Sequence, residues 1–166
     1  KSPLSKQEVG RIGEQVIIAH LQRTGMRDAR PLNAKIANAP VDVVADHSAI
    51  EVKTGLVSNG ASAQQWRATI GQPGKAETEA LKRMSSGQKR ECNQTKAAKI
   101  IERKEAKVVE LARDLGKPPL KSVTMTTILN PNTRTVDVFR FEGFHLRIGW
   151  TPANLARGYV GTYRYG

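Results

Sequence analysis

Two short runs rich in β-branched residues flank the polar Asp-His-Ser at residues 46–48, and this pattern most constrains the fold. β-branched runs on either side of a polar break predict a β-hairpin. Side chains alternate along a strand, so Ile50 and Val52 should point to one face, and Glu51 and Lys53 to the other. The sequence therefore predicts a strand with two opposite charges on one face.

The length of the hairpin turn decides which face an upstream acid occupies. A two-residue turn at residues 47–48 places Asp42 directly across from Lys53, so that Asp42, Glu51 and Lys53 share one face. A three-residue loop places Asp42 on the face opposite Glu51, because a slip of one residue reverses the side-chain direction. A bulge is compatible with either result.

A helix is predicted before the hairpin. Residues 5–8, Ser-Lys-Gln-Glu, match a capping box, and the helix should run to about Arg23. Glu14 is unusual because its neighbours at helical spacing are apolar. Gly10 and Gly13 lower helix propensity and let another backbone or a ligand come close.

The rest of the chain predicts further strands and a long helical region. Residues 29–37 should form a first, irregular strand, and residues 76–115 two helices with a break near residues 85–87. Residues 123–129 and 135–141 are β-rich and should form a second hairpin. The second helix has a predicted core stripe of Ala97, Ile101, Val108, Ala112 and Leu115. A C-terminal tail mixes arginines with aromatic residues, which suits either nucleic-acid contacts or an edge that closes over the core.

Composition restricts the partners and the setting. The 166 residues predict one domain, residues 1–166, and the excess of 27 Lys and Arg over 15 Asp and Glu gives a net charge of +12. This charge favours an anionic polymer as the partner, with nucleic acid as the first candidate, although a solvated helix face is equally expected of a charge run.

The single cysteine, Cys92, suits a reducing compartment. No apolar run reaches the ~20 residues that cross a bilayer, so we expect a soluble, cytoplasmic protein of a bacterial or phage-infected cell. The first residue, Lys1, fits a processed product or a fragment of a longer polypeptide.

Carboxylates gathered on one face require a cation. A few hard oxygen ligands, with room for waters and phosphate oxygens, suit Mg²⁺, and Mn²⁺ is expected to substitute. Such an ion activates a water for phosphodiester hydrolysis, and a neighbouring lysine orients or deprotonates that water.

The order of a helix with an embedded Glu, a hairpin with Asp and Glu-x-Lys, and a basic helical region resembles the PD-(D/E)XK nuclease superfamily. The resemblance covers roughly residues 8–130. It implies an α/β, restriction-endonuclease-like fold with an αβββαβ core and a mixed sheet flanked by helices. Relative to that core, the chain would carry a basic helical insertion and an extra C-terminal hairpin and tail.

The resemblance also implies residue roles. Asp42 is similar to the superfamily's first strand acid, Glu51 and Lys53 to its second acid and lysine, and Glu14 to the helical glutamate of several branches. Asp42, Glu51 and the main-chain carbonyl of Val52 would then bind Mg²⁺, Lys53 would act on the attacking water, and Glu14 would help hold the ion or its waters.

In one respect the sequence departs from the superfamily pattern. Val41 separates Pro40 from Asp42, so the literal Pro-Asp pair is absent. Gln64 or Gln65 could match a glutamine that some members carry near the site.

The leading functional expectation is a Mg²⁺-dependent DNA endonuclease, a phage-associated or toxin-type DNase. The alternatives are a Holliday-junction resolvase of the same superfamily, for which a homodimer is expected, a non-catalytic nucleic-acid-binding module, and a packaging protein. Five basic residues of the helical region are the expected DNA contacts: Lys89, Arg90, Lys96, Lys99 and Arg103.

Overall fold

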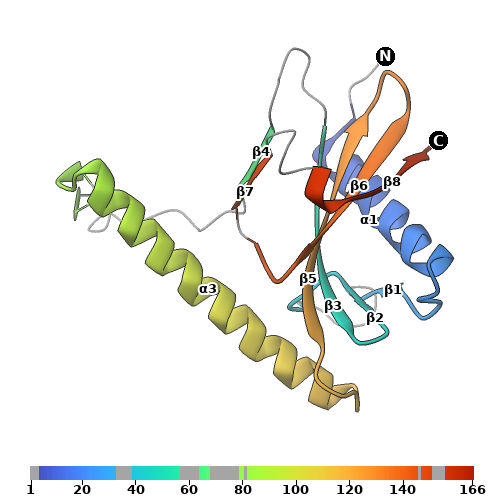
Figure 1. Cartoon of the computed structure of the whole chain (residues 1–166), viewed down its shortest axis with the longest axis horizontal. Helices are drawn as coiled ribbons and strands as arrows, with labels where there is room; N and C mark the ends of the chain where they lie inside the picture. The colour runs from blue at the N-terminus through green and yellow to red at the C-terminus, as the bar shows by residue number, and fades with distance from the viewer. Residues whose placement is uncertain are drawn as a thin grey trace.

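The computed structural model describes residues 4–32, 39–56, 64–67, 79–80, 82–145, 147–150 and 156–166. They form an α/β arrangement in which a six-stranded mixed sheet has helices on both faces (Figure 1). The α/β class and the mixed sheet flanked by helices are therefore confirmed. The elements are α1 (Lys6–Arg23), β1 (Arg30–Pro31), β2 (Val43–Ala45), β3 (Ser48–Leu56), β4 (Gln64–Arg67), α3 (Ser86–Asp114), β5 (Lys121–Asn130), β6 (Thr135–Glu142), β7 (Arg147–Trp150) and β8 (Tyr159–Arg164).

The large sheet has the strand order β1-β2-β3-β5-β6-β8. β3 and β5 pair in parallel and the other neighbours are antiparallel. Parallel neighbours require a crossover connection, and α3 belongs to it. The basic helix is thus the crossover of the sheet and not the insertion that we expected. β4 and β7 pair separately as a two-stranded sheet.

α1 matches its predicted bounds. The Ser5 hydroxyl accepts a hydrogen bond from the Glu8 amide at 3.1 Å, which caps the first turn. After Arg23, Gly25 adopts a φ of 108°, a left-handed conformation that ends the helix without a Cβ penalty.

The hairpin between β2 and β3 has a two-residue turn, but one residue earlier than predicted. Val44 pairs with Ala49 and Ala45 with Ser48, so Asp46 and His47 form the turn. Asp46 has a φ of 53°, which Asp tolerates better than most residues. The pairing of Asp42 with Lys53, expected for a turn at residues 47–48, is wrong by two positions. A shift of two residues leaves each side chain on the face expected for it, because side chains alternate with period two.

α3 begins where the helical break was predicted. Ser85 and Gln88 form a capping box, and Gly116 follows the helix with a φ of 65°. The last turns pack on the sheet through the buried Val108 and Ala112. Leu115 was expected in this core stripe, but 39% of it is exposed because the helix ends there.

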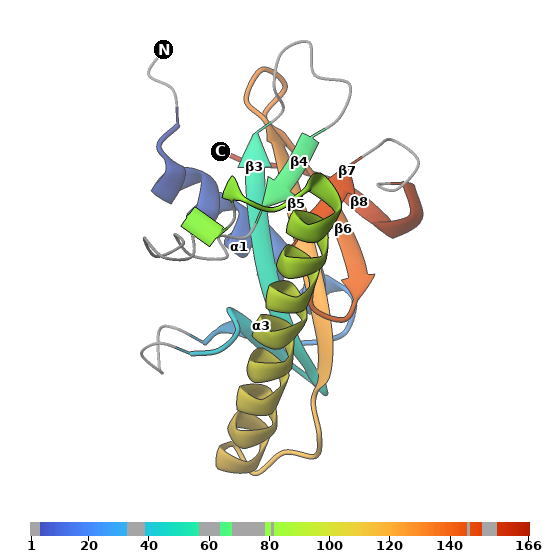
Figure 2. The ribbon, with the colours of Figure 1, turned by 90° about the vertical axis from the view of Figure 1, so that its left-hand side faces the viewer.

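Two cores cover the two faces of the sheet. One face of the sheet packs against α1 and the other against the end of α3 (Figure 2). Both faces receive side chains from the same strands, because successive residues of a strand point to opposite faces. On β5, Val123, Met125 and Leu129 point to the α1 side, whereas Thr124 and Thr126 lie on the α3 side. The α1 face is therefore apolar, and the α3 face of the central strands is polar.

The remaining expectations are met in part. The second hairpin is confirmed as β5 and β6, which pair from Val123 with Glu142 to Asn130 with Thr135. The predicted first strand is confirmed only at β1, since residues 33–38 lie outside the described part of the chain. None of the described helices is both long and apolar enough to cross a bilayer.

Candidate active site

The central strands bring Glu51 and Lys53 to the polar face that α3 covers. Glu51 and Lys53 follow Ala49 at period two, and Ala49 belongs to the core beneath α3. The Lys53 ammonium lies 3.8 Å from Glu51 Oε1. The predicted Glu-x-Lys pair is therefore a partly buried ion pair.

Asp42 lies immediately before the first residue of β2. Its main chain and side chain continue the hydrogen bonding between β2 and β3. Its amide donates to the carbonyl of Ile50 at 3.2 Å, and its Oδ2 accepts from the amide of Val52 at 2.9 Å. The carbonyl of Asp42 accepts from the amide of Leu32 at 2.8 Å. These three bonds fix the Asp42 carboxylate beside β3, next to Glu51.

Glu51 is the electrostatic centre of the site. Only 17% of its side chain is exposed. Burial raises the pKa of Glu51, the negative charge of Asp42 raises it further, and hydrogen bonding and charge from Lys104, with the charge of Lys53, oppose that rise. A carboxylate held this way favours a cation at its oxygens.

Glu14 reaches the same acidic group from α1. Its pKa is raised, first by burial and then by the charge of Asp42. The helix can lie close enough because residue 13 is glycine: a Cβ there would meet Thr54 Oγ1 at 2.1 Å and Thr127 Oγ1 at 2.6 Å. The prediction that Gly13 permits a close approach is confirmed. Around Gly10, none of the described residues lies within 4 Å of an added Cβ, so no close approach of the backbone is seen there.

Lys104 on α3 is a member of the site that the sequence analysis missed. Its ammonium donates to Glu51 Oε2 and lies 5.2 Å from the ring centroid of Phe144. A lysine three residues after Ile101 and four before Val108 lies within the apolar stripe of the helix. This out-of-place charge was the available signal, analogous to the one that marked Glu14.

A buried threonine fixes the aromatic partner of Lys104. The Thr124 hydroxyl donates to the carbonyl of Gly143 at 2.8 Å and accepts from the amide of His145 at 3.1 Å. These bonds hold the corner that carries Phe144, of which 5% is exposed. The ring is thus held in place beneath the Lys104 ammonium.

Thr126 adds a polar atom beside the lysine of β3. It pairs in register with Lys53 across the parallel strands, so both side chains leave the same face. Within the described part of the chain, its buried hydroxyl has no hydrogen-bond partner. Buried polar groups are rarely left unpaired, and an unplaced water or ligand is one common reason.

The donor set fits a hard divalent cation bound by few protein ligands. Among the described residues, no three His, Cys, Asp or Glu side chains converge to hold a metal ion. Mg²⁺ does not require such a cage, because it keeps several waters and is bound through one or two carboxylates. Asp42 and Glu51, with the carbonyl of Val52, are the groups that could hold such an ion, and Glu14 is near enough for the charge of Asp42 to raise its pKa.

The five predicted DNA-contacting residues all lie on α3. Four are exposed and one, Lys96, is half-buried. The side chains of Gln64 and Gln65 lie outside the described residues, so the predicted match to a glutamine near the site stays a prediction. The residues predicted to contact DNA are Lys89, Arg90, Lys96, Lys99 and Arg103.

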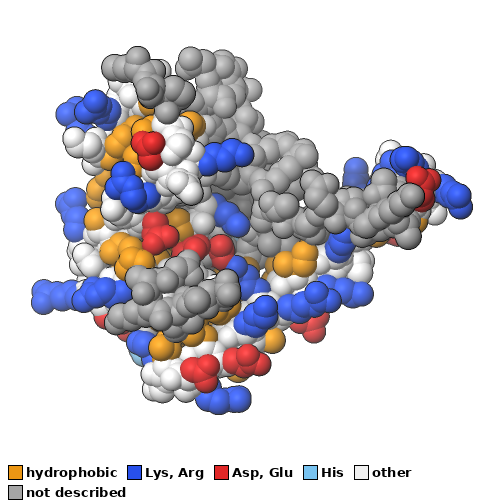
Figure 3. All heavy atoms as spheres, turned by 180° about the vertical axis from the view of Figure 1, so that it is seen from behind, with side chains coloured by type: hydrophobic (Ala, Val, Ile, Leu, Met, Phe, Trp, Pro, Cys, Tyr) orange, Lys and Arg blue, Asp and Glu red, His pale blue; other side chains and the backbone are white. Residues whose placement is uncertain are grey.

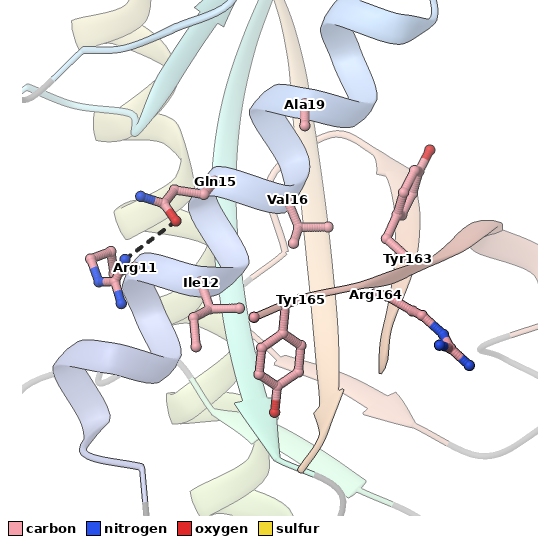
Figure 4. A pocket seen from close by; sticks show the side chains of 9 residues that line it. Arg11, Ile12, Gln15, Val16, Ala19, Tyr163, Arg164 and Tyr165 are labelled. Atoms are coloured by element: carbon pink, nitrogen blue, oxygen red, sulfur yellow. Dashed lines mark hydrogen bonds between the residues drawn. The ribbon is translucent and has the colours of Figure 1, made fainter. Parts of the chain in front are cut away.

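A second hollow lies between α1 and the C-terminal strand, where Arg11, Gln15 and Tyr165 contribute to a cavity of about 370 Å³ (Figure 4). Tyr163, on the same strand, packs edge-on against His20 with ring centroids 5.6 Å apart. The described end of the tail thus closes over α1, and no residue of the acidic site lines this cavity.

Comparison with known proteins found no match among family models, curated proteins or solved structures.

Proposed function

We propose that this protein is a Mg²⁺-dependent endonuclease that hydrolyses DNA phosphodiester bonds. The observation that carries the proposal is the meeting of Asp42, Glu51 and Lys53 on a hairpin, with Glu14 close enough to Asp42 for its pKa to rise. Structural ion pairs seldom need three carboxylates that destabilise one another.

The order of the elements supports a restriction-endonuclease-like fold. α1, β1, β2, β3, α3 and β5 occur in the sequence helix, three strands, helix, strand, with β4 between β3 and α3 among the described elements. β1 to β3 are antiparallel neighbours, and β5 is parallel to β3. This order supports the αβββαβ core that the resemblance implies, in which β6 and β8 would be additions at the far edge.

Each residue has a role that its position supports. Asp42, Glu51 and the Val52 carbonyl would hold the ion, which supplies an activated water and neutralises charge on the phosphate. Lys53, 3.8 Å from Glu51, would orient that water and offset the developing negative charge. Glu14 would bind the outer waters.

The substrate side of the proposal rests on charge. Lys and Arg side chains lie along the length of α3 (Figure 3), and Lys104 connects that helix to Glu51. A basic helix next to a carboxylate site can bind the phosphate backbone and bring one phosphate to the acids.

The test is cleavage of supercoiled, linear, branched and single-stranded DNA, and of RNA, with and without Mg²⁺. Lys53→Ala should lower cleavage by at least about 10²-fold, the usual lower bound for a general acid–base group. The matched control is Lys121→Ala, an exposed lysine that pairs with Glu142 at 3.0 Å away from the site. Equal cleavage by Lys53→Ala, or cleavage indifferent to chelator, contradicts the mechanism.

The cleavage assay, with measurements of DNA binding and of stability, separates the alternative functions. Symmetric cutting of branched DNA by a dimer indicates a junction resolvase, and double-strand cutting or nicking an endonuclease of the DNase type. Salt-sensitive DNA binding without cleavage, together with Mg²⁺-independent stability, indicates a binding module.

A further inference from the structure

We infer that Lys104 is a built-in competitor of the divalent cation: it occupies Glu51 in the metal-free protein and passes to a substrate phosphate when the ion binds. This inference rests on the proposed function and names a second lysine for the same site. The relevant contact is the bond from the Lys104 ammonium to Glu51 Oε2.

The charge balance of the site supports this role. Glu14, Asp42 and Glu51 contribute three negative charges, and Lys53 and Lys104 return two. A divalent cation bound to Glu51 would compete with Lys104 for the same oxygen, since Oε1 already faces Lys53. An ion that binds Oε2 therefore displaces the Lys104 ammonium, which is hydrogen-bonded to that oxygen.

The position of Lys104 determines where the released ammonium can go. It belongs to α3, the helix with the exposed Lys99 and Arg103, and not to β3, the strand that carries Glu51 and Lys53. About 21% of its side chain is exposed, and the face of Phe144 lies 5.2 Å away. An ammonium over an aromatic face keeps a favourable contact while it changes partners, and a phosphate bound to the ion would offer new acceptors.

The first measurement is calorimetric titration of Ca²⁺ or Mn²⁺ alone into the metal-free protein. Lys104→Met keeps the apolar stem and removes the charge, so the ion no longer displaces a charge-assisted hydrogen bond. We expect affinity to rise about tenfold, the scale of such a bond. Lys104→Arg keeps the charge and should stay within about twofold of the wild type by the same measure. Lys107→Met, an exposed lysine of α3, is the matched control and should leave the affinity unchanged.

The second measurement is DNA affinity with saturating Ca²⁺, which is expected to weaken in Lys104→Met more than in Lys107→Met. Unchanged or weaker metal affinity in Lys104→Met overturns the inference and leaves Lys104 a structural tie between α3 and β3. Failure of the proposed function looks different: the wild type and Glu51→Gln would then bind the ion equally poorly. Thermal unfolding of each variant verifies that it is folded.

Discussion

Gly13 on α1 and Thr54 on β3 approach so closely that a Cβ at residue 13 would lie 2.1 Å from Thr54 Oγ1. Thr54 is in turn held by a hydrogen bond of 3.0 Å from Thr127. This contact sets the distance between the helix and the sheet, and Glu14 is the next residue along the helix. The position of the helical glutamate therefore depends on a glycine.

Gly13→Ala should destabilise the protein by about 1–3 kcal/mol, the usual cost of overpacking, although alanine favours helix. Gly10→Ala is the control on the same helix: no atom of the described part of the chain lies within 4 Å of its added Cβ, so it should be neutral or stabilising. Urea unfolding measures both. Equal stability of the two variants would mean that α1 moves away from the sheet at little cost.

Removal of two basic side chains from α3 should weaken DNA binding and its salt dependence. Each phosphate contact contributes about 0.9 to the slope of log K against log salt concentration, so Lys99→Gln with Arg103→Gln should reduce the slope by about 1.8. Fluorescence anisotropy from 50 to 300 mM salt (about the range over which such slopes are usable) measures it. The control is Lys6→Gln with Arg27→Gln, which removes the same charge from exposed positions on and after α1. Equal slopes for the two double variants would exclude α3 as the interface.

Glu14→Gln should stabilise the protein at pH 7. The pKa of Glu14 is raised, so between the ordinary value of 4.5 and the folded-state pKa the native protein binds more protons than the unfolded chain. Stability therefore falls as the pH rises through that window, and the penalty is smallest below pH 4.5. The melting temperature should be higher in the variant at pH 7 and equal to the wild type's at pH 4. Glu110→Gln controls for loss of one exposed negative charge.

His20 should cause the opposite pH dependence. Burial lowers the pKa of His20, and the charges of Arg23 and Arg140 add to the effect. Its contribution is fully present above pH 6.5 and is lost as the pH falls through the lowered folded-state pKa. NMR titration should show this pKa below 6.5, and His20→Gln should lose less stability between pH 6.5 and 5 than the wild type.

Tyr163→Phe tests the partner of that histidine. His20 Nδ1 hydrogen-bonds the Tyr163 hydroxyl, and the Arg23 guanidinium lies 5.6 Å from the ring centroid. The variant keeps the ring and leaves a buried nitrogen unpaired, so we expect a loss of about 1–2 kcal/mol. A loss below about 0.5 kcal/mol in urea unfolding, within the range of ordinary surface substitutions, would mean that water replaces the hydroxyl.

Parts of the site were predictable because they depend on local geometry. Alternation along one strand places Glu51 beside Lys53, and helical spacing marks Glu14 as a charge among apolar neighbours. A two-residue turn was one of the two alternatives that the sequence left open, and the turn lies at Asp46 and His47. The slip of one residue arose because Asp46 tolerates a positive φ.

Other parts depend on contacts between distant segments. Lys104 meets Glu51 across 53 residues of sequence, and only the packing of α3 on the polar face brings them together. The position of the Thr126 hydroxyl beside Lys53 likewise follows from the register of two parallel strands.

The sequence by itself determined the strands of the two hairpins, the long helices and the charges that each would carry, because hydrophobic periodicity and capping act over a few residues. The tertiary structure alone decided which carboxylates repel one another and which lysine neutralises them. Electrostatic energies depend on distance and burial, and these exist only once α1 and α3 have packed on opposite faces of the sheet.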